Sequence, residues 1–316
     1  MAGGAGPLDL AAFAALRDRD LRAEGLVVAE GRLLAERLLA ASRLEVLGVL
    51  CVPALAGRFE ELASGRCPVL VRPEPALAET AGYPFHRGVI AAARRPSLPG
   101  LGALLEGGAA AAGPARTGFS GAQGPARADQ AGAEGRARAA SQDGAAGPAR
   151  GGLAGEAAEA ADPAAARARP RLLLLPATVD PENMGSLFRS AAALGADAVL
   201  LGPGSCDHLS RRALRVSMGA VLSLPAFAAP GPAALAELAR AGYGLAGAVL
   251  DPAARDLSDW LPPRRLCLLI GNEYEGLGPE WLPPIVERVT IPMEPGSDSL
   301  NAAAAAAIFM HRAFRG

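Results

Sequence analysis

The segment from Pro176 to Arg189 places two side chains with binding chemistry at the start of a helical pattern. Asn183 offers an amide donor and acceptor, and Arg189 offers a guanidinium whose fixed donors suit phosphate or carboxylate. An ordinary helix N-cap explains Asn183 equally well, and a surface position explains Arg189. Because this helix follows a buried strand directly, we expect Arg189 near the strand ends, where ligand sites of α/β folds lie.

A second segment, GNEYEGLG, follows another apolar run directly. Gly271 lets a ligand approach the backbone closely, and Asn272 and Glu273 come immediately after it. A glycine-rich turn by itself is weak evidence for a nucleotide site. Its spacing is not that of a dinucleotide-binding fold, which argues against a nicotinamide-dependent oxidoreductase.

The third segment runs from Val289 to Ile308 and leads into an alanine-rich helix. Ser299 is a natural N-cap for that helix, whereas Asn301 in its expected first turn is harder to explain as a structural residue. The six alanines at 302–307 imply that another backbone packs very closely. That neighbour is either a tightly crossing helix or a second subunit.

All three segments lie in a C-terminal piece, residues 171–316, whose short apolar runs are typical of strands buried on both faces of a parallel sheet. The expected strands are Leu172–Leu175, Ala198–Leu201, Leu245–Val249, Leu266–Ile270 and Val289–Ile291. The expected helices are Asn183–Leu194, Ser210–Val216, Pro232–Ala241 and Ser299–Phe314. The fold class is therefore α/β with a doubly wound parallel sheet and a ligand site at the carboxyl ends of its strands.

Residues 1–99 also alternate helices and strands and are predicted to form a small α/β sandwich. Its expected strands are Leu26–Ala29, Val46–Val52, Val69–Val71 and Gly88–Ala92. Residues 100–170 are predicted to be a flexible linker, because 41 of these 71 residues are Ala or Gly and none is Val or Ile. A spacer is the favoured role for the linker, and an RNA-tethering arm is the alternative.

The composition argues against several classes of protein. The 31 basic residues, all arginine, and 32 acidic residues give a net charge of −1, so no broad basic surface is expected. The four Cys and three His are scattered and predict neither a metal site nor a disulfide framework. Neither a signal peptide nor a run of about 18 apolar residues is recognisable. We expect a cytoplasmic protein with no membrane or metal partner.

Taken in order, the three segments resemble the motifs of the SpoU (TrmH-like) class of the SPOUT RNA methyltransferases. The matching residues are Asn183, Gly185 and Arg189, then Gly271, Asn272 and Glu273, then Ile291, Pro292, Ser299, Leu300 and Asn301. The segment RVSMGAVLSLP is also similar to the family. Through VVAEGRLLAERLLAA and FHRGVIAAA, residues 1–99 resemble more loosely the ribosomal-protein-like RNA-binding domain of many members. The long linker departs from the family, where this connection is usually short.

The resemblance implies methyl transfer from S-adenosyl-L-methionine to a ribose 2'-hydroxyl in structured RNA, with rRNA the first choice and tRNA the second. It also implies a SPOUT-type trefoil knot and a homodimer. The cofactor would lie around Gly271, Asn272, Ile291, Met293 and Leu300, and the catalytic residues would be Asn183, Arg189, Glu273, Ser299 and Asn301. The alternative is an inactive RNA-binding or ribosome-assembly factor with the same fold, although an inactive site has no reason to keep five polar groups.

The residue types constrain the roles that the resemblance implies. A guanidinium keeps its proton to above about pH 12, so Arg189 is expected to anchor an RNA phosphate and stabilise alkoxide charge rather than act as a base. Glu273 is expected to orient Arg189 or Asn183, and Ser299 and Asn301 to hydrogen-bond the ribose or the loop. Because the C-terminal piece is net acidic, RNA phosphates are expected to meet a few placed arginines, namely Arg189, Arg211, Arg212, Arg94 and Arg95.

Overall fold

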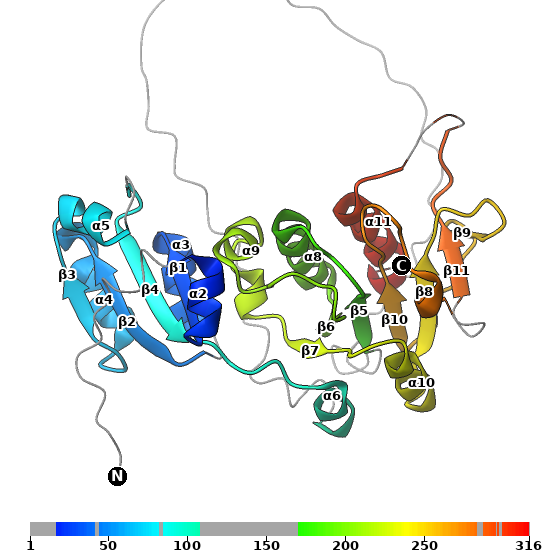
Figure 1. Cartoon of the computed structure of the whole chain (residues 1–316), viewed down its shortest axis with the longest axis horizontal. Helices are drawn as coiled ribbons and strands as arrows, with labels where there is room; N and C mark the ends of the chain where they lie inside the picture. Colours follow the sequence, from blue (N-terminus) through cyan, green and yellow to red (C-terminus); the bar gives the residue numbers. More distant parts are fainter. Residues whose placement is uncertain are drawn as a thin grey trace, which may run out of the picture. The chain divides into compact units, whose positions relative to one another are not determined.

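A computed structural model describes residues 17–41, 44–81, 85–107, 170–282, 287–294, 296 and 299–315 (Figure 1). These ranges belong to one compact unit. The predicted linker lies outside the described residues from position 108 to 169. Within the described part of the chain, no helix is both long and apolar enough to cross a membrane.

The N-terminal residues form a four-stranded mixed sheet with helices packed on it, in agreement with the predicted α/β sandwich. The elements are α2 (Asp18–Ala23), β1 (Leu26–Glu30), α3 (Arg32–Ala41), β2 (Val46–Cys51), α4 (Ala56–Ala63), β3 (Val69–Val71), α5 (Glu74–Ala81) and β4 (Val89–Arg94). The strand order is β1-β4-β2-β3, with β4 antiparallel to both of its neighbours. Because β1 and β4 are antiparallel, the end of β1 lies beside the start of β4, and Glu30 is in register with Ile90.

The predicted boundary of the linker at residue 100 is wrong by several residues. Leu101–Gly107 forms the helix α6, whose Leu101 and Leu104 are buried against the C-terminal sheet. The backbone N–H of Ala228 donates to the Pro99 carbonyl over 2.7 Å, which fixes the entry to this helix. Composition averaged over 71 residues hid a short leucine pattern that is long enough to bury one helical face.

The C-terminal residues form a seven-stranded sheet in which every pairing is parallel. Its strands are β5 (Arg171–Leu175), β6 (Ala198–Leu201), β7 (Ala226–Ala228), β8 (Gly244–Ala248), β9 (Arg255–Asp256), β10 (Leu266–Leu269) and β11 (Glu287–Thr290). Five of these are the predicted strands. The other two, β7 and β9, are edge strands with only three and two residues, too short to show a hydrophobic pattern.

Helices cover both faces of this sheet, as expected for a doubly wound fold (Figure 1). One face buries α8 (Pro181–Leu194), α9 (Arg211–Val216) and α11 (Ala302–Arg315), and the other buries α6 and α10 (Ala233–Arg240). Successive residues of β5 alternate between the two cores. Leu172–Leu175 is therefore a continuous apolar run because both of its faces are covered.

The order of the strands determines where a ligand site lies. The order is β7-β6-β5-β10-β8-β11-β9, so the chain builds outward from β5 in one direction before it crosses to the other side. β5 and β10 are adjacent at the point where this direction reverses. In open α/β sheets the crevice at such a switch point, outside the carboxyl ends of the strands, is the usual ligand site.

Two close helix contacts depend on small residues. Ala303 and Ala306 of α11 are buried where that helix packs against α8, so a tight helix crossing accounts for part of the alanine run. In α8, a Cβ added at Gly185 would lie 2.8 Å from the Ala213 carbonyl oxygen and 2.8 Å from the Val216 Cβ. The approach of α9 to α8 therefore requires glycine at position 185.

We predict that Gly185→Ala lowers the free energy of unfolding by about 1–3 kcal/mol, because the added methyl overlaps the α9 backbone. Gly57→Ala is the matched control, since Gly57 is also helical but a Cβ there meets no atom within 4 Å. The control is expected to keep or raise stability, by up to about 1 kcal/mol. Urea unfolding followed by circular dichroism measures both, and equal midpoints for the two variants would contradict the prediction.

Candidate functional site

Three side chains from the three predicted segments meet near the carboxyl ends of β5 and β10. The Asn183 Nδ2 donates to the Glu273 Oε1 over 2.6 Å, and the Asn301 Nδ2 donates to the Asn183 Oδ1 over 3.2 Å. Asn183 and Asn301 are 118 positions apart in the chain. The fold therefore assembles three of the five predicted catalytic residues into one hydrogen-bonded chain, which we call the Asn183–Glu273–Asn301 network.

The first turn of α8 explains why Asn183 is available for this network. The N-cap is Asp180, whose side chain accepts from the Glu182 N–H over 2.9 Å, and Pro181 occupies the first helical position. The N-cap alternative for Asn183 is therefore wrong. Its amide lies at the third helical position, where it donates to Glu273 and accepts from Asn301.

The loop after β10 is tightly folded around Gly271. A Cβ on Gly271 would overlap the backbone of Gly276, and the Asn272 N–H donates to the Gly276 carbonyl over 2.9 Å. The Asn272 Oδ1 accepts the N–H groups of Tyr274 and Glu275, at 2.9 and 2.6 Å. Asn272, predicted to bind the cofactor, therefore uses this oxygen to shape the turn that presents Glu273.

Glu273 carries an unfilled acceptor. Its Oε1 is bound by Asn183, but its Oε2 is buried and has no hydrogen-bond partner among the described residues. Leaving a buried carboxylate oxygen without a donor costs about 1–3 kcal/mol or more. A ligand hydroxyl or amino group would remove that cost, which marks this oxygen as a binding position.

The start of α11 differs from the expectation. The helix begins at Ala302, and the Asn301 Oδ1 accepts from the backbone N–H groups of Ala303 and Ala304 at 2.9 and 3.2 Å. Asn301 is thus the N-cap, and the assignment of that role to Ser299 is wrong. Ser299 is exposed and hydrogen-bonds to none of the described residues. Because the Asn301 Nδ2 also reaches Asn183, one amide both ends the loop and extends the network.

Arg189 projects from α8 into solvent and makes no hydrogen bond or ion pair with any described residue. Of the two partners proposed for Glu273, the structure therefore has Asn183 and not Arg189. The charge of Arg189 acts on Arg37: burial, and then the like charge of Arg189, lower the pKa of Arg37. The Arg189 guanidinium is left available for an anionic ligand.

Three of the predicted cofactor residues, Ile291, Met293 and Leu300, follow β11 in the chain. Ile291 is partly buried against the core, Met293 is partly exposed, and Leu300 is 41% exposed. Between them, residues 295, 297 and 298 lie outside the described part of the chain. Leu300 is an apolar side chain that the described residues leave partly exposed.

The loop after β6 supports the site, and the sequence did not single it out. The Cys206 N–H donates to the Thr178 carbonyl over 2.8 Å, and the Ser205 Oγ donates to the Leu175 carbonyl over 2.9 Å. A Cβ on Gly202 would overlap Pro176. These contacts hold the segment that leads into α8. The sequence signal for this loop is Gly202-Pro-Gly204, two glycines directly after a buried strand.

Two titratable residues of this loop, Asp207 and His208, are largely buried and each contacts a partner side chain. Asp207 accepts two hydrogen bonds from Arg95, at 2.9 and 2.7 Å, and both side chains are 15% exposed. His208 stacks on Phe188 of α8 with 5.6 Å between ring centroids. Burial lowers the pKa of His208 to about 4 against the opposing charge of Asp207, so the imidazole is neutral at pH 7. Arg95 and His208 are therefore part of the framework beneath α8.

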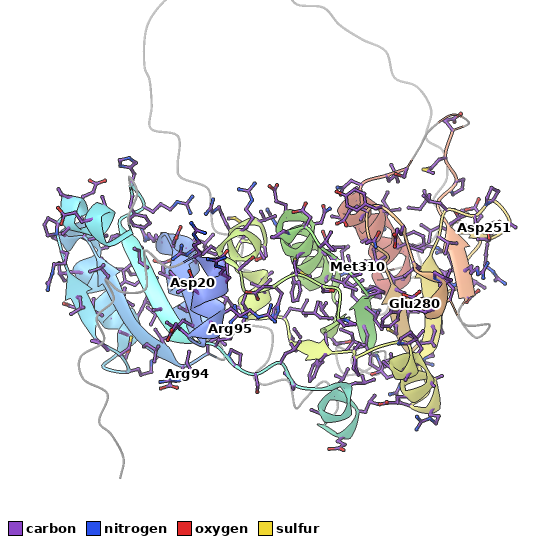
Figure 2. All side chains as sticks on the ribbon, in the orientation of Figure 1. Asp20, Arg94, Arg95, Asp251, Glu280 and Met310 are labelled. Carbon is purple, nitrogen blue, oxygen red and sulfur yellow. The ribbon has the colours of Figure 1, made fainter. Side chains whose placement is uncertain are left out.

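The predicted RNA-binding arginines are mostly paired within the protein. Arg94 and Arg95 follow one another at the end of β4, where Arg94 pairs with Glu45 and Arg95 with Asp207 (Figure 2). The Arg211 Nε lies 3.2 Å from the Glu30 Oε1, and Arg212 pairs with Glu182. Arg95 and Arg211 are largely buried by these pairs, which disagrees with their predicted contact with RNA. Sequence proximity of arginines did not reveal that each has an acidic partner elsewhere in the chain.

Residues 170–311 match the model of the SpoU rRNA Methylase family. A Mycobacterium bovis protein described as an uncharacterized tRNA/rRNA methyltransferase is 31% identical over 297 residues, which cover 92% of this chain and 82% of that protein. The 23S rRNA (guanosine(2553)-2'-O)-methyltransferase of Bacillus subtilis is 31% identical over 141 residues, covering 45% of this chain and 56% of that protein. This chain belongs to the SpoU rRNA methylase family.

A solved structure agrees with the fold. The SpoU methyltransferase AviRb from Streptomyces viridochromogenes, crystallised in complex with AdoMet, superposes with a TM-score of 0.63 at 22% sequence identity. The match covers 97% of this chain and 96% of that one. The parallel sheet and the order of its elements are therefore those of a SpoU methyltransferase.

We predict that Asn301→Ala and Asn301→Asp separate the two roles of this residue. Asn301→Ala removes the N-cap and is expected to lower the free energy of unfolding by about 1 kcal/mol, whereas Asn301→Asp keeps a capping oxygen and stays near the wild-type value. Both remove the amide that donates to Asn183, so both are expected to lower methyl transfer by about tenfold or more. Thermal unfolding and a methyl-transfer assay measure the pair, and a fully active Asn301→Asp protein would contradict a site role.

Proposed function

We propose that this chain is an S-adenosyl-L-methionine-dependent RNA methyltransferase that methylates a ribose 2'-hydroxyl in ribosomal RNA. The observation that carries the proposal is the Asn183–Glu273–Asn301 network, with a buried unfilled oxygen on Glu273, at the switch point of a SpoU-family sheet. The Bacillus subtilis relative, named as a 23S rRNA 2'-O-methyltransferase, supports the choice of hydroxyl and of RNA. Transfer RNA is the second choice of substrate.

The site's residues fit the cofactor. S-adenosyl-L-methionine supplies a methyl group activated by attachment to a sulfonium sulfur. Gly271 allows the loop after β10 to fold back on Gly276 and so shapes the turn that carries Glu273, and Ile291, Met293 and Leu300 supply apolar surface after β11. The unfilled Glu273 oxygen accepts a hydrogen bond from a ligand hydroxyl or amino group. These donors, acceptors and apolar groups match a ligand that is part nucleoside and part amino acid.

The remaining residues are suited to position and activate the ribose hydroxyl. A ribose hydroxyl is a poor nucleophile at neutral pH, so the site has to position it and stabilise the charge that develops on its oxygen. Arg189 is exposed on α8 and carries a guanidinium with a fixed fork of donors, which suits it to hold the RNA phosphate next to that hydroxyl. Asn183 is fixed in orientation by Glu273 and Asn301 and sets the geometry of the network.

The wider organisation follows from the family. We propose that residues 1–99 form a ribosomal-protein-like RNA-binding domain, that the linker is a spacer, and that residues 171–316 form the methyltransferase domain with the family's trefoil knot. We also propose a homodimer. Ile308 of α11 is 45% exposed and Ala304 beside it is exposed as well, so this face of the alanine-rich helix is free to meet a second copy.

The proposed activity is tested by two measurements on the full-length protein. Calorimetry with S-adenosylhomocysteine is expected to show binding, and tritiated S-adenosyl-L-methionine is expected to label an unmodified 23S rRNA transcript more than a tRNA transcript. Resistance of the labelled position to alkaline hydrolysis identifies 2'-O-methylation. Cofactor binding without labelling of any RNA would favour an assembly factor, and no cofactor binding would refute the proposal.

We predict that Arg189→Lys lowers the rate of methyl transfer by about 100-fold, because a point charge does not replace the guanidinium's fixed donors at a developing negative charge. Its affinity for S-adenosylhomocysteine is expected to stay within about threefold of wild type. Arg240→Lys on α10, at the opposite face of the sheet, is the control and should keep full activity. Near-normal turnover by Arg189→Lys would remove Arg189 from the catalytic residues.

A further inference from the structure

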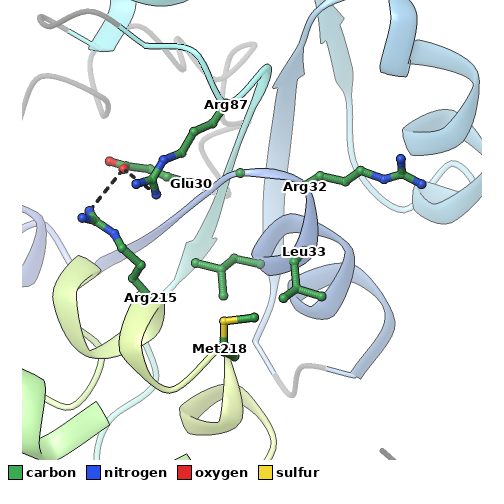
Figure 3. A pocket seen from close by; sticks show the side chains of 8 residues that line it. Glu30, Arg32, Leu33, Arg87, Arg215 and Met218 are labelled. Atoms are coloured by element: carbon green, nitrogen blue, oxygen red, sulfur yellow. Dashed lines mark ion pairs between the residues drawn. The ribbon is translucent and has the colours of Figure 1, made fainter. Parts of the chain in front are cut away.

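Glu30 at the end of β1 is the centre of an arginine cluster that the proposed chemistry does not use. Its carboxylate is only 7% exposed and lies 3.2 Å from Arg211, 3.8 Å from Arg215 and 4.0 Å from Arg87. Figure 3 shows Arg87 and Arg215 turned toward Glu30 from opposite sides. One buried carboxylate therefore faces three guanidiniums, one from the bend that precedes β4 and two from α9.

The charges around this carboxylate do not balance. A surface pocket of about 240 Å³ is lined by Arg32, Arg87 and Arg215, and Glu30 is its single acidic lining residue. Arg32 is paired with Glu36 at 3.0 Å, whereas among the described residues the ion pairs of Arg87 and Arg215 are the long contacts to Glu30, and each of the two side chains is 42% exposed. Both therefore present guanidinium donors to solvent beside a carboxylate that is already shared with Arg211, although Arg211 also lies 4.0 Å from the Asp18 carboxylate.

The positive charge continues from this pocket toward the active site. Met218, which lines the pocket, has a φ of 52°, and its carbonyl accepts a hydrogen bond from Arg37 of α3. An added Cβ at the adjacent Gly219 would lie 3.1 Å from the Arg37 side chain, so these residues pack closely. The pKa of Arg37 is lowered, first by burial and second by the like charge of Arg189. The helices that carry these two arginines, α3 and α8, both pack against the short helix Ala220–Leu222 that follows Gly219.

We infer that Arg87, Arg215, Arg37 and Arg189 form a track that binds successive phosphates of the substrate RNA and leads its backbone to the ribose that is methylated. The inference rests on the proposed function and deepens it, because it names the surface that holds the RNA. Glu30 keeps Arg87 and Arg215 in place when RNA is absent. The track replaces the predicted set of Arg94, Arg95, Arg211 and Arg212, all of which have acidic partners at 3.3 Å or less within the protein.

RNA is the anion that this arrangement fits best. An RNA backbone carries one negative charge per nucleotide, so a row of guanidiniums is complementary to it along its whole length, and Arg supplies paired donors to each phosphate. A single free phosphate would engage only one end of the track. The track also ends at Arg189, the residue proposed to hold the phosphate next to the reacting hydroxyl.

Salt dependence of RNA binding tests the inference in the full-length protein. Affinity for an unmodified 23S rRNA transcript is measured by filter binding between about 50 and 300 mM NaCl. Arg87→Gln is expected to weaken binding at least about threefold at 100 mM and to reduce the slope of log affinity against log salt by about 0.7–0.9, the share of one phosphate contact. Arg87→Gln with Arg37→Gln is expected to lose about twice that slope.

Arg94→Gln is the matched control. Arg94 is an exposed arginine at the end of β4, the strand that follows Arg87, and it has its own partner, Glu45. It should keep both affinity and slope, and Arg87→Lys should keep the slope. Unchanged binding by Arg87→Gln, an equal loss in Arg94→Gln, or no binding by the unaltered protein would overturn the track. Labelling of RNA by the same preparations judges the methyltransferase separately, and S-adenosylhomocysteine affinity and thermal unfolding check that each variant is folded.

Discussion

The pairing of β10 with β5 is the constraint on which the site depends. Leu266–Leu269 lies in parallel register beside Arg171–Leu174, although about 90 residues separate the two strands in the chain. Because both strands end at the same edge, the helix that follows β5 and the loop that follows β10 start side by side. The 2.6 Å bond between Asn183 and Glu273 is the direct result. Insertion of β10 elsewhere in the sheet would leave each of these side chains on an isolated loop.

Close backbone packing then fixes the geometry at this edge. Gly271 allows its loop to fold back on itself, Gly202 lets the loop after β6 lie against the segment before α8, and Gly185 admits α9 beside α8. Each is a place where a single methyl would push elements apart. The buried pair of Arg95 and Asp207 adds charge-assisted hydrogen bonds to the same support. The site is rigid because it is held from beneath by groups that touch no ligand.

Electrostatics in this protein is local. The net charge of −1 gives no sign of a polyanionic partner, and many arginines of the described residues pair with a carboxylate of their own. What distinguishes one surface is the incomplete matching around Glu30, where three guanidiniums share that carboxylate and Asp18 lies near Arg211 alone. A protein of nearly neutral charge can therefore still present a placed row of cations, at the cost of keeping like charges close together. A few placed arginines fix the position of an RNA backbone on the surface, whereas a broad basic surface would attract it without fixing its position.

The sequence by itself determined the alternation of elements, the parallel character of the C-terminal sheet and the three polar segments, because burial on both faces leaves continuous apolar runs and glycine and asparagine stand out after them. It did not determine which residues cap the helices, which partner Glu273 binds, or where the linker begins. Only the tertiary structure showed that Asp180 and Asn301 are the helix caps, that Asn183 is free to bind Glu273, and that α6 is folded. It alone found the partners of the arginines as well. Caps and ion pairs depend on atoms brought together from distant positions, and composition and periodicity carry no information about such distances.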